Sequence, residues 1–163
     1  MDSQQIMIES KLSRVREMRE QISRLKAENL ALRSELESLR AHFDIALLAA
    51  EDLRSGAELE IWDGWNLILG SKREAQDKAG LLRLAKSSGR RIWIVFDGKD
   101  ENVFEDGLVR VSYTGGSGEH RADKFICDFL RMAKYLGLAG KVSVRTNDKG
   151  FLAQARQIVA KKR

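Results

Sequence analysis

The feature that most constrains this chain is a seven-residue repeat of apolar side chains near its N-terminus, with no glycine or proline before Gly56 to interrupt a helix. Isoleucine or valine at the first repeat position with leucine at the fourth favours two parallel helices, and a single asparagine at a first position, here Asn29, selects the dimer. The repeat therefore predicts a parallel homodimeric coiled coil through residues 8–46. Its central contacts are expected from Ile22, Leu25, Asn29, Leu32, Leu36 and Leu39.

The charges beside this repeat agree with self-pairing over its C-terminal half. In a parallel dimer Glu28 would face Arg33 of a second copy, and Glu35 would face Arg40. The alternative is an amphipathic helix packed on its own domain, which usually shows a wider apolar face with a period of 3.6. We therefore expect a coiled-coil helix over residues 1–50, a junction over 51–57 and a folded domain over 58–163. Deleting residues 1–46 should then leave a folded monomer.

The predicted domain alternates strand-like and helix-like segments. Short apolar runs at residues 58–62, 92–96, 109–113 and 142–144 predict strands, and longer segments at 73–88, 121–136 and 149–160 predict helices. The run at 92–96 is almost continuously apolar, as expected for a strand that is covered on both faces in a parallel sheet. This order of elements predicts a three-layer α/β domain with a mostly parallel sheet.

Composition limits the compartment and the partners. The single cysteine, Cys127, cannot form an internal disulfide, and no apolar run approaches the roughly 20 residues that a membrane helix needs. We expect a cytoplasmic protein with no membrane contact. Residues 51–163 contain 21 Lys or Arg against 16 Asp or Glu, whereas residues 1–50 are balanced, so the whole net charge of +5 lies in residues 51–163. A basic domain surface fits a polyanionic partner; the alternative is a solvated surface without one.

Four aspartates end strand-like runs or open a helix: Asp63, Asp97, Asp123 and Asp148. The carboxyl ends of parallel strands meet at one edge of a sheet, so residues far apart in sequence can converge there. Clustered carboxylates repel one another unless a cation lies between them, and hard oxygen ligands suit Mg²⁺ or Mn²⁺. The pattern predicts a metal-dependent nuclease centre. Each aspartate alone has a simpler interpretation, because aspartate often caps helices.

Four motifs in order resemble the NYN domain family, in particular its YacP-like branch within the PIN-like ribonuclease superfamily. The quoted segments are IWDGWNLI, IVFDGK, GEHRADKFI and VRTNDKGF. The family's DGYN motif is matched by residues 63–66, with Trp65 in the tyrosine position, and its strand ending in Phe-Asp by Phe96 and Asp97. Its Ala-Asp step is matched by Ala122 and Asp123, and its Thr-Ser/Asn-Asp step by residues 146–148.

The resemblance covers residues 58–160 and implies a PIN-like, three-layer domain that hydrolyses RNA with one or two divalent ions, as an endoribonuclease. It implies that Asp63, Asp123 and Asp148 bind the Mg²⁺ or Mn²⁺, and that Asp97 binds it directly or through water. Among the supporting polar residues, Asn66 is expected to hydrogen-bond a ligand carboxylate, with Thr146 and Asn147 beside it. RNA would be held by a basic rim that we assign to Lys72, Arg73, Lys99, His120, Arg121 and Lys124.

One departure from the family leaves other functions open. YacP-like sequences often have a second acid one helical turn after the Ala-Asp step, where this chain has Cys127, and the next acid is Asp128. A five-residue offset turns Asp128 away from Asp123, so we expect it to be a surface charge. The second candidate function is therefore an RNA-binding module that cleaves little and recruits partners through the coiled coil. A phosphatase or nucleotide-binding protein is the third.

Overall fold

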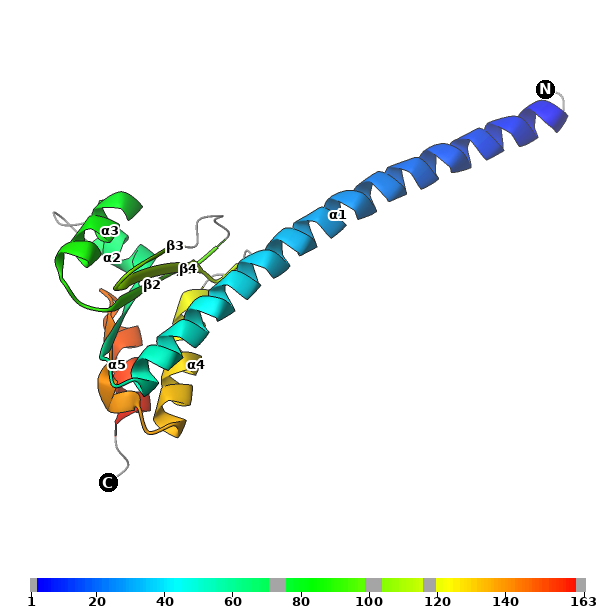
Figure 1. The fold of residues 1–163 in the computed structure, drawn as a ribbon. Helices are drawn as coiled ribbons and strands as arrows, with labels where there is room; N and C mark the ends of the chain where they lie inside the picture. Colours follow the sequence, from blue (N-terminus) through cyan, green and yellow to red (C-terminus); the bar gives the residue numbers. More distant parts are fainter. Residues whose placement is uncertain (1–2, 71–75, 99–103, 116–119, 161–163) are drawn as a thin grey trace. The chain divides into compact units, whose positions relative to one another are not determined.

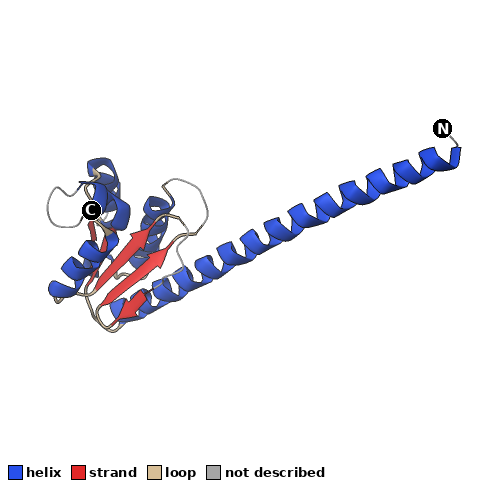
Figure 2. Cartoon of the chain, turned by 90° about the horizontal axis from the view of Figure 1, so that it is seen from above, coloured by secondary structure: helices blue, strands red, loops and turns tan. Residues whose placement is uncertain are grey.

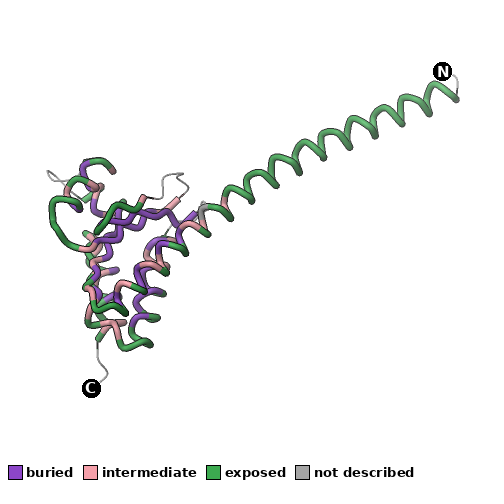
Figure 3. Tube along the Cα trace, viewed as in Figure 1, coloured by how far each residue is buried: buried purple, intermediate pink, exposed green. Residues whose placement is uncertain are grey.

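The chain divides into two compact units, Met1–Leu36 and Glu37–Arg163. Helix α1 (Ser3–Arg54) begins in the first unit and ends in the second. The computed structural model describes residues 3–70, 76–98, 104–115 and 120–160 (Figure 1). In the first unit the side chains of residues 4–36 are exposed apart from the half-buried Glu35 (Figure 3). The apolar stripe of this unit therefore has no cover from the described part of its own chain.

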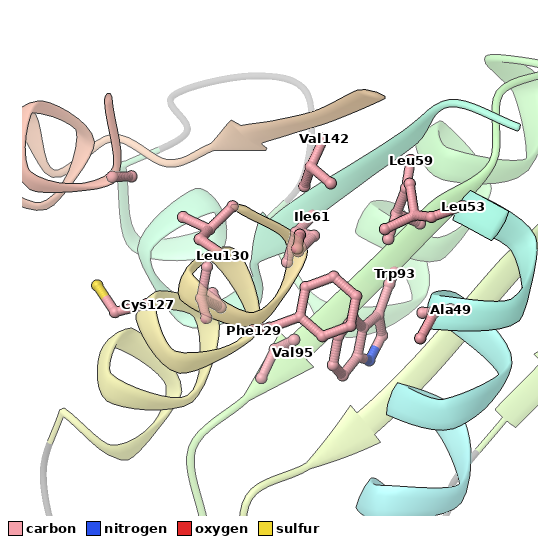
Figure 4. Close-up of a cluster of buried hydrophobic side chains, with 14 of the residues drawn as sticks. Ala49, Leu53, Leu59, Ile61, Trp93, Val95, Cys127, Phe129, Leu130 and Val142 are labelled. Carbon is pink, nitrogen blue, oxygen red and sulfur yellow. The ribbon is translucent and has the colours of Figure 1, made fainter. Parts of the chain in front are cut away.

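In the second unit the last turns of α1 are part of the hydrophobic core. The side chains of His42, Ile45, Ala49 and Leu53 are buried, and three of these four belong to the same core cluster as strand residues of the sheet (Figure 4). The His42 ring is next to Trp93, and both side chains contact the hydroxyl of Ser112. The helix ends at Arg54, four residues after the end expected from the repeat, and the compact unit begins at Glu37 rather than near residue 58.

The second unit contains one five-stranded mixed sheet in the order β3-β4-β2-β1-β5. Its strands, which are red in Figure 2, are β1 (Leu59–Asp63), β2 (Ile92–Phe96), β3 (Phe104–Asp106), β4 (Val109–Tyr113) and β5 (Val142–Arg145). β4, β2, β1 and β5 are parallel, and β3 is antiparallel to β4. The expected α/β class and mostly parallel sheet are confirmed. β3 was not predicted, because it is three residues long and only half-buried at best.

Helices cover both faces of the sheet and give the domain three layers. α2 (Gly64–Gly70) and α3 (Lys78–Ser87) pack on the face with Trp62, Ile94 and Phe96. α4 (Arg121–Tyr135), α5 (Lys149–Val159) and the end of α1 pack on the face with Ile61 and Trp93 (Figure 4). A 3₁₀ turn, η1 (Ala139–Lys141), precedes β5. Alternate residues of β1 and β2 enter different cores, so β2 is apolar on both faces and β1 contributes Ile61 to one core and Trp62 to the other.

The helices between β1 and β2 differ from the sequence prediction. α2 follows directly on Asp63 and was not predicted, because seven residues are too few to show a helical period. The predicted helix at residues 73–88 begins at Lys78, where Asp77 is the N-cap and accepts a hydrogen bond from the backbone N–H of Gly80 at 2.6 Å. The predicted start of this helix, at residues 73–75, lies outside the described residues.

Candidate functional site

The order of the strands reverses at the boundary between β1 and β5. From β1 the chain continues outward through β2 to β4, and it returns on the other side of β1 as β5. In open α/β sheets, ligands bind in the crevice outside the carboxyl ends of the strands at such a reversal. Asp63 is the last residue of β1, and Thr146, Asn147 and Asp148 directly follow β5. Two of the four predicted motifs therefore meet at the reversal.

Asp63 is buried at this point, and only 3% of the residue is exposed. Its Oδ2 accepts hydrogen bonds from the Asn66 amide at 2.6 Å and from the Thr146 hydroxyl at 3.0 Å. The expected hydrogen bond from Asn66 is therefore present. Burial raises the pKa of Asp63 above its usual value, the two side-chain donors oppose this rise, and the negative charge of Asp97 adds to it. The charged form of Asp63 is stabilised only in part by its neighbours.

The segment after β5 is joined to β1 through hydrogen bonds. The Thr146 hydroxyl that donates to Asp63 also accepts from the backbone N–H of Asp148 at 3.1 Å. Asp148 is the N-cap of α5, where its Oδ1 accepts from the backbone N–H of Phe151 at 3.0 Å. The Asn147 amide donates to the carbonyl of Asn66 at 3.0 Å. Thr146 thus couples Asp63 to the backbone of Asp148.

Asp97, directly after β2, and Asp123, in α4, complete the acidic group. Asp97 Oδ1 accepts hydrogen bonds from the backbone N–H of Ala122 at 2.5 Å and from the Thr114 hydroxyl at 3.4 Å. Asp123, in the first turn of α4, is half-buried. Burial raises the pKa of Asp123 above its usual value, and the negative charges of Asp63 and Asp97 raise it further, whereas His120 lowers it. The negative charge of Asp97 therefore acts on Asp63, and those of Asp63 and Asp97 act on Asp123.

The predicted metal ligands are brought together only in part. Asp63 and Asp123 interact through their charges, and Asp148 is connected to Asp63 through Thr146. Within residues 3–70, 76–98, 104–115 and 120–160, no group of three or more His, Cys, Asp and Glu side chains could hold a metal ion together. Magnesium commonly binds through one or two carboxylates, with waters and substrate phosphates as its other ligands. The donor chemistry of Asp63 and Asp123 fits that mode.

The predicted basic rim is visible only at the start of α4. His120 has a left-handed backbone (φ 59°) and an exposed side chain whose Nδ1 lies 3.4 Å from the Asp123 carboxylate. Arg121 donates to the Thr114 carbonyl at 3.4 Å, and Lys124 is exposed. Lys72, Arg73 and Lys99 lie outside the described residues.

The acid that departs from the family pattern is a surface charge, as expected. Asp128 is exposed and pairs with Arg131 at 2.6 Å. The neighbouring Cys127 is buried, and burial raises the pKa of its thiol. Neither side chain contributes a second acid to the group around Asp63.

Three residues near the acidic group were not predicted to have a role there. Thr114 bonds to Asp97, Trp65 donates from its indole to the Asp97 carbonyl at 3.0 Å, and the Lys78 ammonium lies 5.0 Å from the Trp65 ring centroid. The position of Trp65, two residues after Asp63, could have suggested its place at the sheet edge. No local signal marks Lys78, because its location depends on where α3 begins.

Comparisons with protein-family models, with curated proteins and with solved structures find no match to this chain. Among its described helices, none combines the length and the apolar character needed to span a membrane. Function is therefore inferred from the residues and geometry of the chain itself.

Proposed function

We propose that this chain is a metal-dependent ribonuclease with a PIN-like, NYN-type domain, which hydrolyses RNA phosphodiester bonds at the carboxyl edge of its sheet. The observation that carries the proposal is the buried carboxylate of Asp63, which lies where the strand order reverses. This carboxylate interacts electrostatically with Asp97 and Asp123. Carboxylates whose pKa is raised by burial and by neighbouring charges are candidates for function. The order of the four motifs that resemble the NYN family supports the same conclusion.

The roles of the side chains follow from their contacts. When bound, Mg²⁺ or Mn²⁺ would lower the pKa of a water and neutralise charge on the phosphate in the transition state. Asp63, Asp123 and Asp148 would bind this ion. Asn66 and Thr146 orient Asp63 by donating to the same carboxylate oxygen, Oδ2. Asp97 fixes the first turn of α4, and with it Asp123, through its bond to Ala122.

The decisive experiment compares two aspartates of the same helix. Labelled single-stranded and structured RNAs are incubated with the intact chain, Asp123→Asn and Asp128→Asn, each in Mg²⁺, Mn²⁺ or EDTA. We expect the intact chain and Asp128→Asn to cut RNA only with a metal ion, because Asp128 is exposed and paired with Arg131. Asp123→Asn should lose at least about 100-fold in rate, as expected for the loss of a group worth about 3 kcal/mol in the transition state.

A second readout separates metal binding from catalysis. A ligand that binds only the folded state at 100 times its Kd stabilises the protein by about 2.7 kcal/mol. Mn²⁺ should therefore raise the Tm of the intact chain and of Asp128→Asn more than that of Asp123→Asn. Cleavage that persists in EDTA, or an Asp123→Asn variant that cuts as fast as the intact chain, contradicts the proposed metal centre.

The proposed enzyme acts as a parallel dimer through the N-terminal repeat. The seam residues Ile22, Leu25, Leu32 and Leu36 are each about half exposed in the first unit, and a row of exposed apolar side chains of this kind indicates an interface. Leu39 is half-buried in the second unit. Pairing would place two catalytic domains on one RNA and raise their avidity.

The dimer is tested with two leucines of the same helix. Leu32 is on the seam, whereas Leu30, which is 71% exposed, is off it. We expect Leu32→Asp to give a monomer in sedimentation equilibrium and Leu30→Asp to remain a dimer. Equal masses for the two variants would rule out the seam that the repeat defines.

The second candidate function is an RNA-binding module with little catalysis. The observation that favours it is that no three potential ligands in the described part of the chain form a metal site together. In the cleavage experiment this function predicts equal RNA binding by all three proteins and no cutting with any metal ion.

A further inference from the structure

Three aromatic side chains lie side by side at the carboxyl ends of three neighbouring strands. Trp65 follows β1, Phe96 ends β2 and Tyr113 ends β4. The rings of Phe96 and Tyr113 stack with centroids 5.3 Å apart, and Trp65 meets Phe96 edge to face at 5.2 Å. Phe96 and Tyr113 are buried, and Trp65 joins this aromatic wall to the acidic group, because its indole donates to the carbonyl of Asp97.

The indole of Trp65 is fixed in place but not buried. Its Nε1 donates to the carbonyl of Asp97 at 3.0 Å, which sets the orientation of the ring. The other two tryptophans of the chain, Trp62 and Trp93, are 1% and 0% exposed, whereas Trp65 is 36% exposed. Trp65 is therefore the tryptophan that can meet a ligand.

A cation lies against the same wall. The ammonium of Lys78, the first residue of α3, is 5.0 Å from the ring centroid of Trp65, 5.5 Å from that of Phe96 and 4.7 Å from that of Tyr113. Aromatic faces attract cations at these distances. The wall thus places a positive charge next to Trp65, separate from His120 and Arg121 at the start of α4.

Proteins that bind single-stranded nucleic acids combine these two elements. A basic group binds the phosphate backbone, and an aromatic side chain contacts the face of a base that is not paired. We propose that Trp65 and Lys78 form a nucleotide subsite, in which Trp65 contacts one unpaired base of an RNA strand and Lys78 binds the adjoining phosphate. The subsite rests on the proposed function, because it places that nucleotide next to the acidic group. It makes single-stranded RNA the preferred substrate over duplex RNA.

The simplest competing role is structural, with Lys78 and Trp65 only fastening α3 to the sheet. In that case their replacement changes the Tm but leaves RNA affinity unchanged once the variants are folded. The two roles are separated by binding measurements in EDTA, where no metal-dependent cleavage can occur. The ligand is a labelled eight-nucleotide single-stranded RNA, compared with the same sequence in a duplex, and the protein is the full chain.

Four variants give the test its matched controls. Trp65→Leu should weaken single-strand binding about tenfold or more, which is the loss expected for one base-aromatic contact, and Trp65→Phe should retain most of the affinity. Lys78→Met should reduce the slope of log affinity against log salt by about 0.7, the value for one phosphate of a single strand, and Lys78→Arg should keep the slope. Duplex binding should change little in all four.

Tryptophan fluorescence tests the subsite separately, because RNA would not change the emission of Trp65 if Trp65 had only a structural role. Saturating single-stranded RNA should quench the tryptophan emission of the intact chain, and Trp65→Phe should bind RNA without this quenching, because Trp62 and Trp93 are buried. Unchanged affinity in Trp65→Leu together with an unchanged salt slope in Lys78→Met overturns the subsite. If Trp65→Leu does not fold, absence of quenching in the intact chain overturns it.

The result is independent of the cleavage assay. If the chain binds RNA through Trp65 but does not cut RNA with Mg²⁺ or Mn²⁺, the proposed subsite stands and the proposed nuclease activity is refuted. If the chain cuts RNA but replacement of Trp65 and Lys78 does not change its RNA binding, the proposed nuclease activity stands and the proposed subsite is refuted.

Discussion

Truncation of α1 at two positions should have opposite effects on folding. A chain that begins at residue 37 retains the whole second unit, whereas one that begins at residue 51 lacks Ile45, Ala49 and Ala50, which are at most 7% exposed, together with the fully buried His42. We expect the chain of residues 37–163 to fold and, because it lacks most of the apolar seam, to be a monomer. The chain of residues 51–163 should be largely unfolded.

The expected difference follows from the buried side chains. Burial of an isoleucine side chain contributes about 1.5–3 kcal/mol and each buried methyl group about 0.8 kcal/mol, so Ile45 and the two alanines contribute about 3–5 kcal/mol. The sheet residues that they cover, including Trp93 and Leu59, also become exposed. Because a domain of this size is stable by only about 5–15 kcal/mol, the loss removes a large part of its stability.

Urea unfolding, followed by circular dichroism at several denaturant concentrations, measures this difference. The chain of residues 37–163 should show a cooperative transition, and the chain of residues 51–163 should show none or one at a much lower midpoint. Equal midpoints for the two truncations would refute the conclusion that the end of α1 belongs to the core. The repeat alone predicts that a third chain, which begins at residue 47, is a folded monomer; because this chain lacks the buried His42 and Ile45, we now expect it to be destabilised as well.

Three further predictions concern single residues. Burial lowers the pKa of His42 from 6.5 to about 4. The contribution of the neutral His42 side chain to the free energy of unfolding is therefore complete above pH 6.5 and is lost as the pH falls. The free energy of unfolding should drop by about 2 kcal/mol between pH 7 and pH 5, and His42→Leu should remove this pH dependence. A Cβ at Gly64 would lie 2.3 Å from an aromatic ring, so Gly64→Ala should cost about 1–3 kcal/mol in urea unfolding, whereas Gly140→Ala, with open space around it, should cost little. Thr146→Val should cost about 1–3 kcal/mol and Thr146→Ser much less, because only the hydroxyl donates to Asp63; equal losses would contradict this role.

The sequence predicted the centre of the sheet well because β1, β2 and β4 are buried along almost their whole length. Residues 92–96 were predicted as a strand and form β2, since every side chain there is apolar and buried. Short elements were missed for the opposite reason. Both α2 and β3 are too short to show a period, and their conformations depend on contacts with β2 and β4 that are not encoded locally.

The end of α1 illustrates a second limit. Phe43 and Ala46 continue the heptad repeat, so the sequence assigned this stretch to a coiled coil. In the structure the core receives the off-seam residues His42, Ile45 and Ala49 as well as Ala50 and Leu53, which continue the seam positions, whereas Phe43 on the seam is 54% exposed. One helix can present two apolar stripes, and a repeat alone does not say which of them the domain covers.

The candidate site was predictable at the level of strand ends but not of hydrogen bonds. The positions of Asp63 and Asp97 followed from the rule that parallel strands end at one edge. That Asp97 would bond to the backbone of Ala122, 25 residues later, has no local signal. The same holds for Lys78, whose contact with three rings required knowledge of where α3 begins.

The division of α1 at Leu36 and Glu37 has a practical consequence for engineering. The residues before this point have no contact role in the domain core, whereas those after it are part of the fold. The first 36 residues can therefore be exchanged for another helical sequence of known trimeric or tetrameric state without altering a single core side chain. Such chimeras would vary the number of domains per assembly while each domain stays the same, and so would test how the proposed cleavage of long RNA depends on copy number alone.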